Sequence, residues 1–132
     1  MNTLYRAMLP AEDGAPMVGD SRNQLGVRPS DVKGANAGPG QGGLSVTVGD
    51  YRRMMAPLRP KAFGGLHPET VLYELPRTAL DAASKLQLGP IDTRTYHAVI
   101  EAREPCPVPE FQAVLQATRP SWSRTEPPDR GP

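Results

Sequence analysis

The sequence contains a single cysteine, Cys106, so no disulfide can form within the chain. Its cysteine content therefore gives no reason to expect an oxidising compartment. Neither sign of charge is in excess, because 15 Lys and Arg residues stand beside 14 Asp and Glu residues and the formal net charge is +1. This balance gives no electrostatic case for a nucleic-acid partner, which requires a concentrated basic face.

Long apolar runs are also missing, and we expect no secretory leader in the first residues. No stretch approaches the roughly 20 apolar residues of a membrane-spanning helix, so no membrane partner is expected. Residues 1–10 have no apolar run after a basic start and do not resemble a secretory signal peptide. We expect a cytoplasmic protein, and if it is a secreted effector it leaves its cell without a cleaved signal.

The sequence has few groups that bind metals or act as nucleophiles. The histidines are His67 and His97, and no cluster of His and Cys has the spacing of metal ligands, so we expect no metal site. Cys106 lies between two prolines, and nothing beside it in the sequence lowers a thiol pKa, so a nucleophilic role is not expected.

Proline and glycine are abundant, with 16 and 13 residues, and they favour loops and short strands. A chain of 132 residues corresponds to one domain. Alternating apolar and polar residues predict strands over 3–9, 44–48, 71–75 and 95–102. Helical patterns occur over 51–55, where Asp50 is the expected cap, and over 78–88 and 109–118. The prediction is a single α+β domain over 1–122, followed by a polar, disordered tail over 123–132.

A long irregular segment, residues 17–43, separates the first two predicted strands. Leu25, Val27 and Val32 are expected to fix part of it to the core. Its glycine-rich end, residues 38–43, lacks the Lys-Ser/Thr ending of a phosphate-binding loop and precedes a strand instead of a helix. A flexible connection is the simpler interpretation of these glycines.

Polar residues interrupt three of the predicted strands. Arg6 lies in an otherwise apolar strand, where an inward guanidinium needs an anionic partner. A carboxylate such as Glu74 or the phosphate of a ligand can fill that role, and the sequence leaves both open. Ser45 and Thr47 share one face of the second strand, as expected of an ordinary solvated face.

The last predicted strand places two ionisable groups on one face. His97 and Glu101 lie about 13 Å apart along it at the usual rise per residue. Taken alone, a strand histidine is usually structural and a carboxylate at a strand end is usually solvated. The order Arg6, Ser45, Glu101 nevertheless follows the Arg, Ser, Glu order of enzymes that break the nicotinamide–ribose bond of NAD. In these enzymes a carboxylate stabilises the positive charge that develops on the ribose.

Three segments carry a family resemblance: LYRAM at 4–8, GGLSVTV at 42–48 and YHAVIEAREP at 96–105. With RNQLGVRPSDV at 22–32, they are similar to the ADP-ribosyltransferase-like toxin family of the type VI secretion exported effector two, over residues 4–122. The resemblance implies an ADP-ribosyltransferase-like fold in which two small sheets form an NAD cleft.

The resemblance also implies a role for each polar residue, with NAD as substrate. Arg6 holds the pyrophosphate or ribose, and Ser45, with Thr47, braces the nicotinamide side. His97 bonds to the cofactor or the acceptor, and Glu101 supplies the stabilising charge. It further implies a role in interbacterial competition, a cognate immunity protein and a macromolecular acceptor of ADP-ribose.

The sequence departs from relatives of this fold in ways that leave alternatives open. A late-strand Glu is not a fixed feature of this toxin family, so the role of Glu101 comes from the wider transferase fold. Val99 occupies the position where arginine-modifying transferases carry Glu or Gln, so an arginine acceptor is not expected. Two alternative functions remain open: an NAD glycohydrolase of the same fold and a non-catalytic binding module. The enzyme interpretation requires Arg6 and Glu101 to face one cleft.

Overall fold

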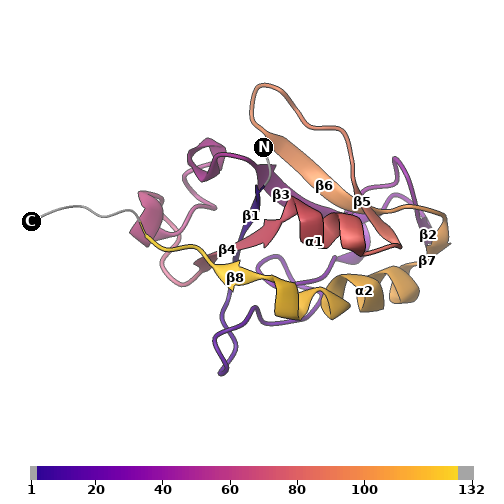
Figure 1. Ribbon diagram of the computed structural model, residues 1–132, viewed down its shortest axis with the longest axis horizontal. Helices are drawn as coiled ribbons and strands as arrows, with labels where there is room; N and C mark the ends of the chain where they lie inside the picture. The colour runs from indigo at the N-terminus through magenta and orange to yellow at the C-terminus, as the bar shows by residue number, and fades with distance from the viewer. Residues whose placement is uncertain (1–2, 128–132) are drawn as a thin grey trace, which may run out of the picture.

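The computed structural model describes residues 3–127. Its strands are β1 (Thr3–Met8), β2 (Asn36–Ala37), β3 (Leu44–Val48), β4 (Val71–Pro76), β5 (Leu86–Leu88), β6 (His97–Ala102), β7 (Cys106–Pro107) and β8 (Ser123–Arg124). The two α-helices are α1 (Arg77–Ala82) and α2 (Val108–Ala117), as Figure 1 shows. Single turns of 3₁₀ helix occur at Pro29–Asp31, Tyr51–Arg53, Lys61–Phe63 and Arg119–Ser121.

The main sheet has six strands in the order β5-β6-β3-β1-β4-β8, and all neighbouring strands are antiparallel. The strands β2 and β7 form a separate two-stranded ribbon. The chain is therefore a small α+β protein built on a mostly antiparallel sheet, as the strand and helix patterns predicted. One large sheet with a short ribbon replaces the two small sheets that the resemblance implied.

The junction between β1 and β3, in the middle of the main sheet, is short. In the described structure it consists of two residue pairs, Leu4 with Val48 and Tyr5 with Thr47. By contrast, β1 pairs with β4 along its whole length. Past Tyr5 the strands β1 and β3 separate, and the sheet divides into a β5-β6-β3 half and a β1-β4-β8 half.

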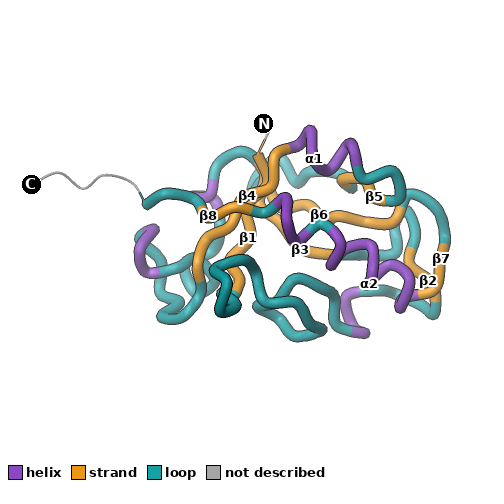
Figure 2. Tube along the Cα trace, turned by 60° about the horizontal axis from the view of Figure 1, so that its bottom comes forward, coloured by secondary structure: helices purple, strands orange, loops and turns teal. Residues whose placement is uncertain are grey.

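The two faces of the sheet are covered differently. Both helices lie on one face (Figure 2), where Leu80 of α1 and Phe111 and Leu115 of α2 are completely buried in the main core. The other face carries a smaller apolar cluster of Met54, Phe63 and Leu72, formed where the segment 51–63 packs over β1 and β4. Burial of apolar area on both faces is the main stabilising contribution to such a fold.

Most of the predicted elements are confirmed. The four expected strands correspond to β1, β3, β4 and β6. Leu25, Val27 and Val32 are buried in the main core and fix the long segment to it. Asp50 accepts a hydrogen bond from the backbone N–H of Arg52, as expected of a cap, although the helix it starts is a single 3₁₀ turn.

Two expected elements differ from the structure. The helix predicted over 78–88 was wrong in its second half, because α1 ends at Ala82 and residues 86–88 form β5 instead. Pairing of β5 with the edge of β6 satisfies its backbone groups and buries Leu86, which outweighs local helix propensity. The disordered tail predicted over 123–132 was wrong at its start, because Ser123 and Arg124 pair with β4 beside the buried Trp122.

Residues 128–132 lie outside the described part of the chain. Across residues 3–127, neither α-helix is both long enough and apolar enough to cross a membrane.

Gly43 tests how closely β3 packs against β6. A Cβ atom at this position would collide with the backbone carbonyl of Ile100. We expect Gly43→Ala to lower the free energy of unfolding by about 1–3 kcal/mol, because the backbone of one strand must shift. Gly34 is the matched control, since a Cβ there meets no atom within 4 Å. Urea denaturation of both variants checks this, and equal stabilities would contradict the packing described.

Candidate functional site

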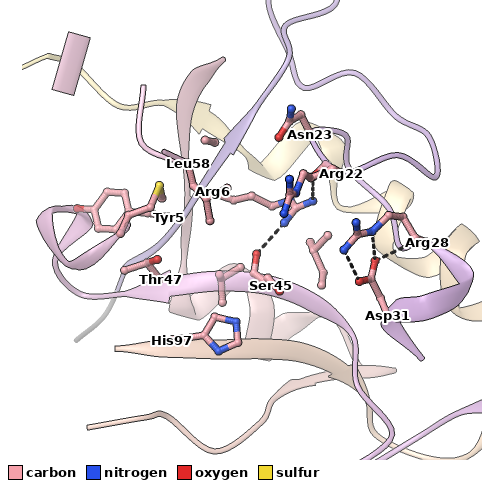
Figure 3. Close-up of a pocket in the computed structure, with 14 residues that line it drawn as sticks. Tyr5, Arg6, Arg22, Asn23, Arg28, Asp31, Ser45, Thr47, Leu58 and His97 are labelled. Carbon is pink, nitrogen blue, oxygen red and sulfur yellow. Dashed lines mark hydrogen bonds and ion pairs between the residues drawn. The ribbon is translucent and has the colours of Figure 1, made fainter. Parts of the chain in front are cut away.

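A pocket of about 190 Å³ opens where β1 and β3 separate, on the face of the sheet away from the helices. Figure 3 shows its polar lining. Cationic side chains come from Arg6, Arg22 and Arg28, and Asp31 is the carboxylate among the lining residues. Asn23, Ser45, Thr47 and His97 complete the polar part, and the apolar wall includes Tyr5, Ala7, Met54 and Leu58.

Arg6 crosses the gap between the two halves of the sheet. It lies on β1 between Leu4 and Met8, which are both completely buried. Its Nη1 donates to the backbone carbonyl of Ser45 at 2.9 Å. Its Nη2 donates to the carbonyls of Arg22 at 2.9 Å and Gln24 at 3.0 Å. The guanidinium thus joins β1 to β3 and to the loop 22–24.

No carboxylate within residues 3–127 forms an ion pair with Arg6. Glu74 is not the partner that the sequence left open, because it stands opposite Tyr5 in the pairing of β1 with β4. Burial lowers the pKa of Arg6 to about 10, Asp31 raises it, and Arg28 lowers it further. Arg6 remains charged at neutral pH, and its buried Nε has no hydrogen-bond partner. A half-buried cation without a direct counter-ion favours an anionic ligand.

Ser45, Thr47 and His97 come to the same pocket from adjacent strands. Thr47 of β3 stands opposite His97 of β6, and Ser45 lies two residues along β3. The Ser45 hydroxyl and the His97 ring make no hydrogen bond within residues 3–127, and both residues are exposed. The structure therefore brings together Arg6, Ser45, Thr47 and His97, four of the five residues singled out from the sequence. Their roles toward NAD stay predictions.

Glu101 does not line this pocket. By strand alternation it lies on the same side of β6 as His97, but the residue is only 4% exposed. Its Oε1 accepts a hydrogen bond from the backbone N–H of Gly40 at 3.1 Å, and its Oε2 accepts one from the Gln87 amide at 2.7 Å. The glycine-rich turn at 38–43 thus contacts the carboxylate. The catalytic role of Glu101 stays a prediction of the resemblance.

The sequence analysis missed the pair of Arg28 and Asp31 at one end of the pocket. The backbone N–H and Nη2 of Arg28 donate to the Asp31 carboxylate at 2.7 and 3.0 Å. Burial alone would raise the pKa of Asp31, but the hydrogen bonds from Arg28 outweigh it and hold the pKa below its usual value. The pattern Arg-Pro-Ser-Asp predicts a turn. No local pattern indicates that this turn packs beside Ser45.

Cys106 lies far from this pocket in the fold, in β7 beside α2. Burial raises the pKa of its thiol, with Glu110 raising it further, and both effects disfavour the thiolate that a nucleophile requires. No group of three or more His, Cys, Asp or Glu in the described part of the chain has an arrangement able to hold a metal ion.

No protein-family model matches this chain, and searches of curated proteins and of solved structures likewise gave no match. The resemblance to the toxin family therefore rests on the quoted sequence segments. What the geometry adds is a polar pocket with an uncompensated cation. Such a pocket is suited to a ligand that carries phosphate and has hydroxyl groups for Ser45 and His97 to bind.

Arg6→Met tests the role of the guanidinium in joining the sheet. Methionine keeps much of the volume but leaves three backbone carbonyls without their donor. We expect the free energy of unfolding to fall by about 1–3 kcal/mol, because the Gln24 carbonyl is partly buried and an unsatisfied buried acceptor costs about that much, whereas water can replace the donor at the exposed carbonyls of Ser45 and Arg22. The control is Arg94→Met, which changes an exposed arginine outside the pocket. Urea denaturation curves that coincide for the two variants would show that Arg6 does not hold the two strands together.

Asp31→Asn tests the pair with Arg28 through its dependence on pH. The folded pKa of Asp31 is depressed, so its contribution to stability is complete above the unfolded pKa of about 3.9 and is lost as the pH falls through the folded value. The stability difference between wild type and variant is expected to be constant from pH 7 to 5 and to shrink toward pH 3. Urea titrations at these values measure it, with the exposed Asp20→Asn as control. A difference that persists at pH 3 would argue against the pairing.

Proposed function

We propose that this chain is a small bacterial toxin of the ADP-ribosyltransferase type, which binds NAD at the Arg6 pocket and cleaves its nicotinamide–ribose bond. One observation carries the proposal. A half-buried guanidinium without a counter-ion shares a pocket with Ser45, Thr47 and His97, the positions that the resemblance relates to the cofactor. The fold itself supports the proposal only at the level of a small α+β domain with a divided antiparallel sheet.

The cationic part of the pocket fits the pyrophosphate of NAD. A guanidinium has five N–H donors, and the backbone carbonyls engage three of those of Arg6. Two donors remain, the buried Nε and one at Nη1, and the Nη1 donor together with the charge is available to a phosphate. Arg22 and Arg28 add two further guanidinium groups to the lining, of which that of Arg28 is paired with Asp31. Drug-sized ligands usually occupy pockets of about 300–1,000 Å³. With about 190 Å³, this pocket encloses part of a dinucleotide and leaves the remainder at the surface.

The reaction consists of one bond cleavage and one bond formation. The bond between the ribose C1′ and the nicotinamide nitrogen breaks, and the electron pair leaves with nicotinamide. An acceptor oxygen or nitrogen then bonds to C1′ and loses a proton, for which the exposed His97 is a suitable base. Ser45 has a hydroxyl available to orient the ribose or nicotinamide amide. With water as acceptor the same pocket would give an NAD glycohydrolase, and with a macromolecule it would give a transferase.

The biological setting follows from the resemblance alone. It comprises action in the cytoplasm of a target cell, delivery without a cleaved signal, and a cognate immunity protein that protects the producer. The macromolecular acceptor is not identified by any feature of the pocket.

A non-catalytic binding module is the second candidate, and the position of Glu101 favours it. The Glu101 carboxylate is buried against the glycine-rich turn and does not line the pocket, and the carboxylate that does line it, Asp31, is paired with Arg28, so the Glu101 charge does not meet the ribose there. Such a module would bind NAD or another phosphate ligand without consuming it. Binding measured by calorimetry, with no release of nicotinamide, distinguishes this candidate from the enzyme.

Ser45→Ala and His97→Ala provide the test of the proposed function. The purified wild type is expected to release nicotinamide from NAD. Each variant is expected to lose at least about tenfold of that turnover with an unchanged melting temperature, because neither removed group bonds within the described fold. Chromatography of the products separates free ADP-ribose from ADP-ribose attached to a macromolecule.

Arg94→Met is the control for these variants, since its side chain is exposed and lies outside the pocket. The enzyme proposal fails if the wild type leaves NAD intact in the presence of a bacterial lysate. It also fails if both pocket variants keep full turnover.

A further inference from the structure

The Glu101 carboxylate is enclosed by neutral hydrogen-bond donors. One oxygen accepts from the backbone N–H of Gly40 and the other from the side-chain amide of Gln87. No Lys, Arg or His within residues 3–127 forms an ion pair with it. Gly89 closes the remaining side, since a Cβ atom there would lie 3.1 Å from Oε1. In this position the carboxylate contacts the glycine-rich turn instead of the pocket.

That turn connects Glu101 to the wall of the pocket. Gly42 packs so closely on the backbone carbonyl of Asp31 that a Cβ atom would collide with it, and it forms a β-bridge with Val32. The next residue, Gly43, packs equally closely on β6. The chain then enters β3, where Ser45 lines the pocket. The turn therefore lies between Glu101 and two lining residues, Asp31 and Ser45.

We propose that Glu101 is a positioning residue, which fixes the turn at Gly40 and thereby holds the wall formed by Asp31 and Ser45, without contacting NAD. The inference rests on the proposed function for the identity of the ligand. Its physical basis is the hydrogen bond to Gly40, which depends on an acceptor oxygen and not on a net charge. A glutamine at position 101 retains that acceptor, and rotation of the Gln87 amide provides an oxygen for the new N–H donors.

This distinction makes two substitutions informative. Glu101→Gln removes the charge and keeps the bond to Gly40, whereas Glu101→Met removes both at similar volume. Glu104→Gln is the matched control, because Glu104 is an exposed carboxylate three residues along the chain and does not line this pocket. The kinetic constants for NAD, the affinity for inorganic pyrophosphate and the hydrogen-exchange rate of the Gly40 amide are measured for each protein.

For Glu101→Gln we expect kcat, KM, pyrophosphate affinity and Gly40 exchange within about threefold of wild type. For Glu101→Met we expect KM to rise about tenfold with kcat nearly unchanged, as for a loss of uniform binding. Its pyrophosphate affinity is expected to fall by a similar factor, and the Gly40 amide to exchange at least about tenfold faster. Recovery of binding by glutamine but not by methionine distinguishes positioning from a general loss of stability.

Two results would overturn the inference. A loss of about 100- to 1,000-fold in kcat for Glu101→Gln would assign the carboxylate a charge-based role in the reaction. If the Gly40 amide of Glu101→Met exchanges as slowly as in wild type and the pyrophosphate affinity is unchanged, the hydrogen bond between Gly40 and Glu101 does not fix the turn or the pocket wall. If Glu101→Met does not fold, the result for Glu101→Gln alone decides between charge and acceptor. If the wild type does not consume NAD, the proposed function fails, while the pyrophosphate and exchange measurements still decide the role of Glu101.

Discussion

The hydrogen bonds of the Arg6 guanidinium to three backbone carbonyls are the interaction on which the pocket depends. They connect β1, β3 and the loop 22–24 at the point where the strands stop pairing. Because no carboxylate neutralises it directly, the same side chain that closes the gap also creates a positive potential in it. Arg6 therefore both joins the two strands and creates the positive potential that would attract an anion. A substitution at Arg6 changes both properties.

The division of the sheet explains why a pocket exists here. Continuous pairing of β1 with β3 would leave no room between Arg6 and Ser45, whereas the observed junction at Leu4 and Tyr5 opens the sheet after two residue pairs. The β5-β6-β3 half contributes Ser45, Thr47 and His97, and the other half contributes Arg6. A small movement of one half relative to the other would alter the spacing between cation and hydroxyl groups. The contacts of the glycine-rich turn with Glu101 and Ile100 lie within the first half and hold that half together.

Sequence patterns identified the strands well, because alternation of apolar residues directly reflects one buried face. They failed at β5, where Leu86 continues the helical stripe of Leu80 and Ala83 but also alternates with Leu88 as in a strand, and only pairing with β6 decides between the two. Four residues that line the pocket were singled out because polar groups interrupt apolar strands. Arg28 and Asp31 were missed because their approach to Ser45 depends on how the long segment packs. The burial of Glu101 was missed for the same reason, since Gly40 covers it from 61 residues away in the sequence.

The short strand β8 has a consequence for the behaviour of the protein in concentrated solution. It pairs with Tyr73 and Glu74, and the N–H of Thr125 bonds to the carbonyl of Leu72, so the middle of β4 is covered. At the opposite side of the sheet the outermost strand, β5, is only three residues long. Exposed strand edges are templates on which further chains add and aggregate, and natural sheets protect them with short or covered strands. A chain that ended before Ser123 would expose the backbone of β4, an edge rich in buried apolar residues, to other copies of itself.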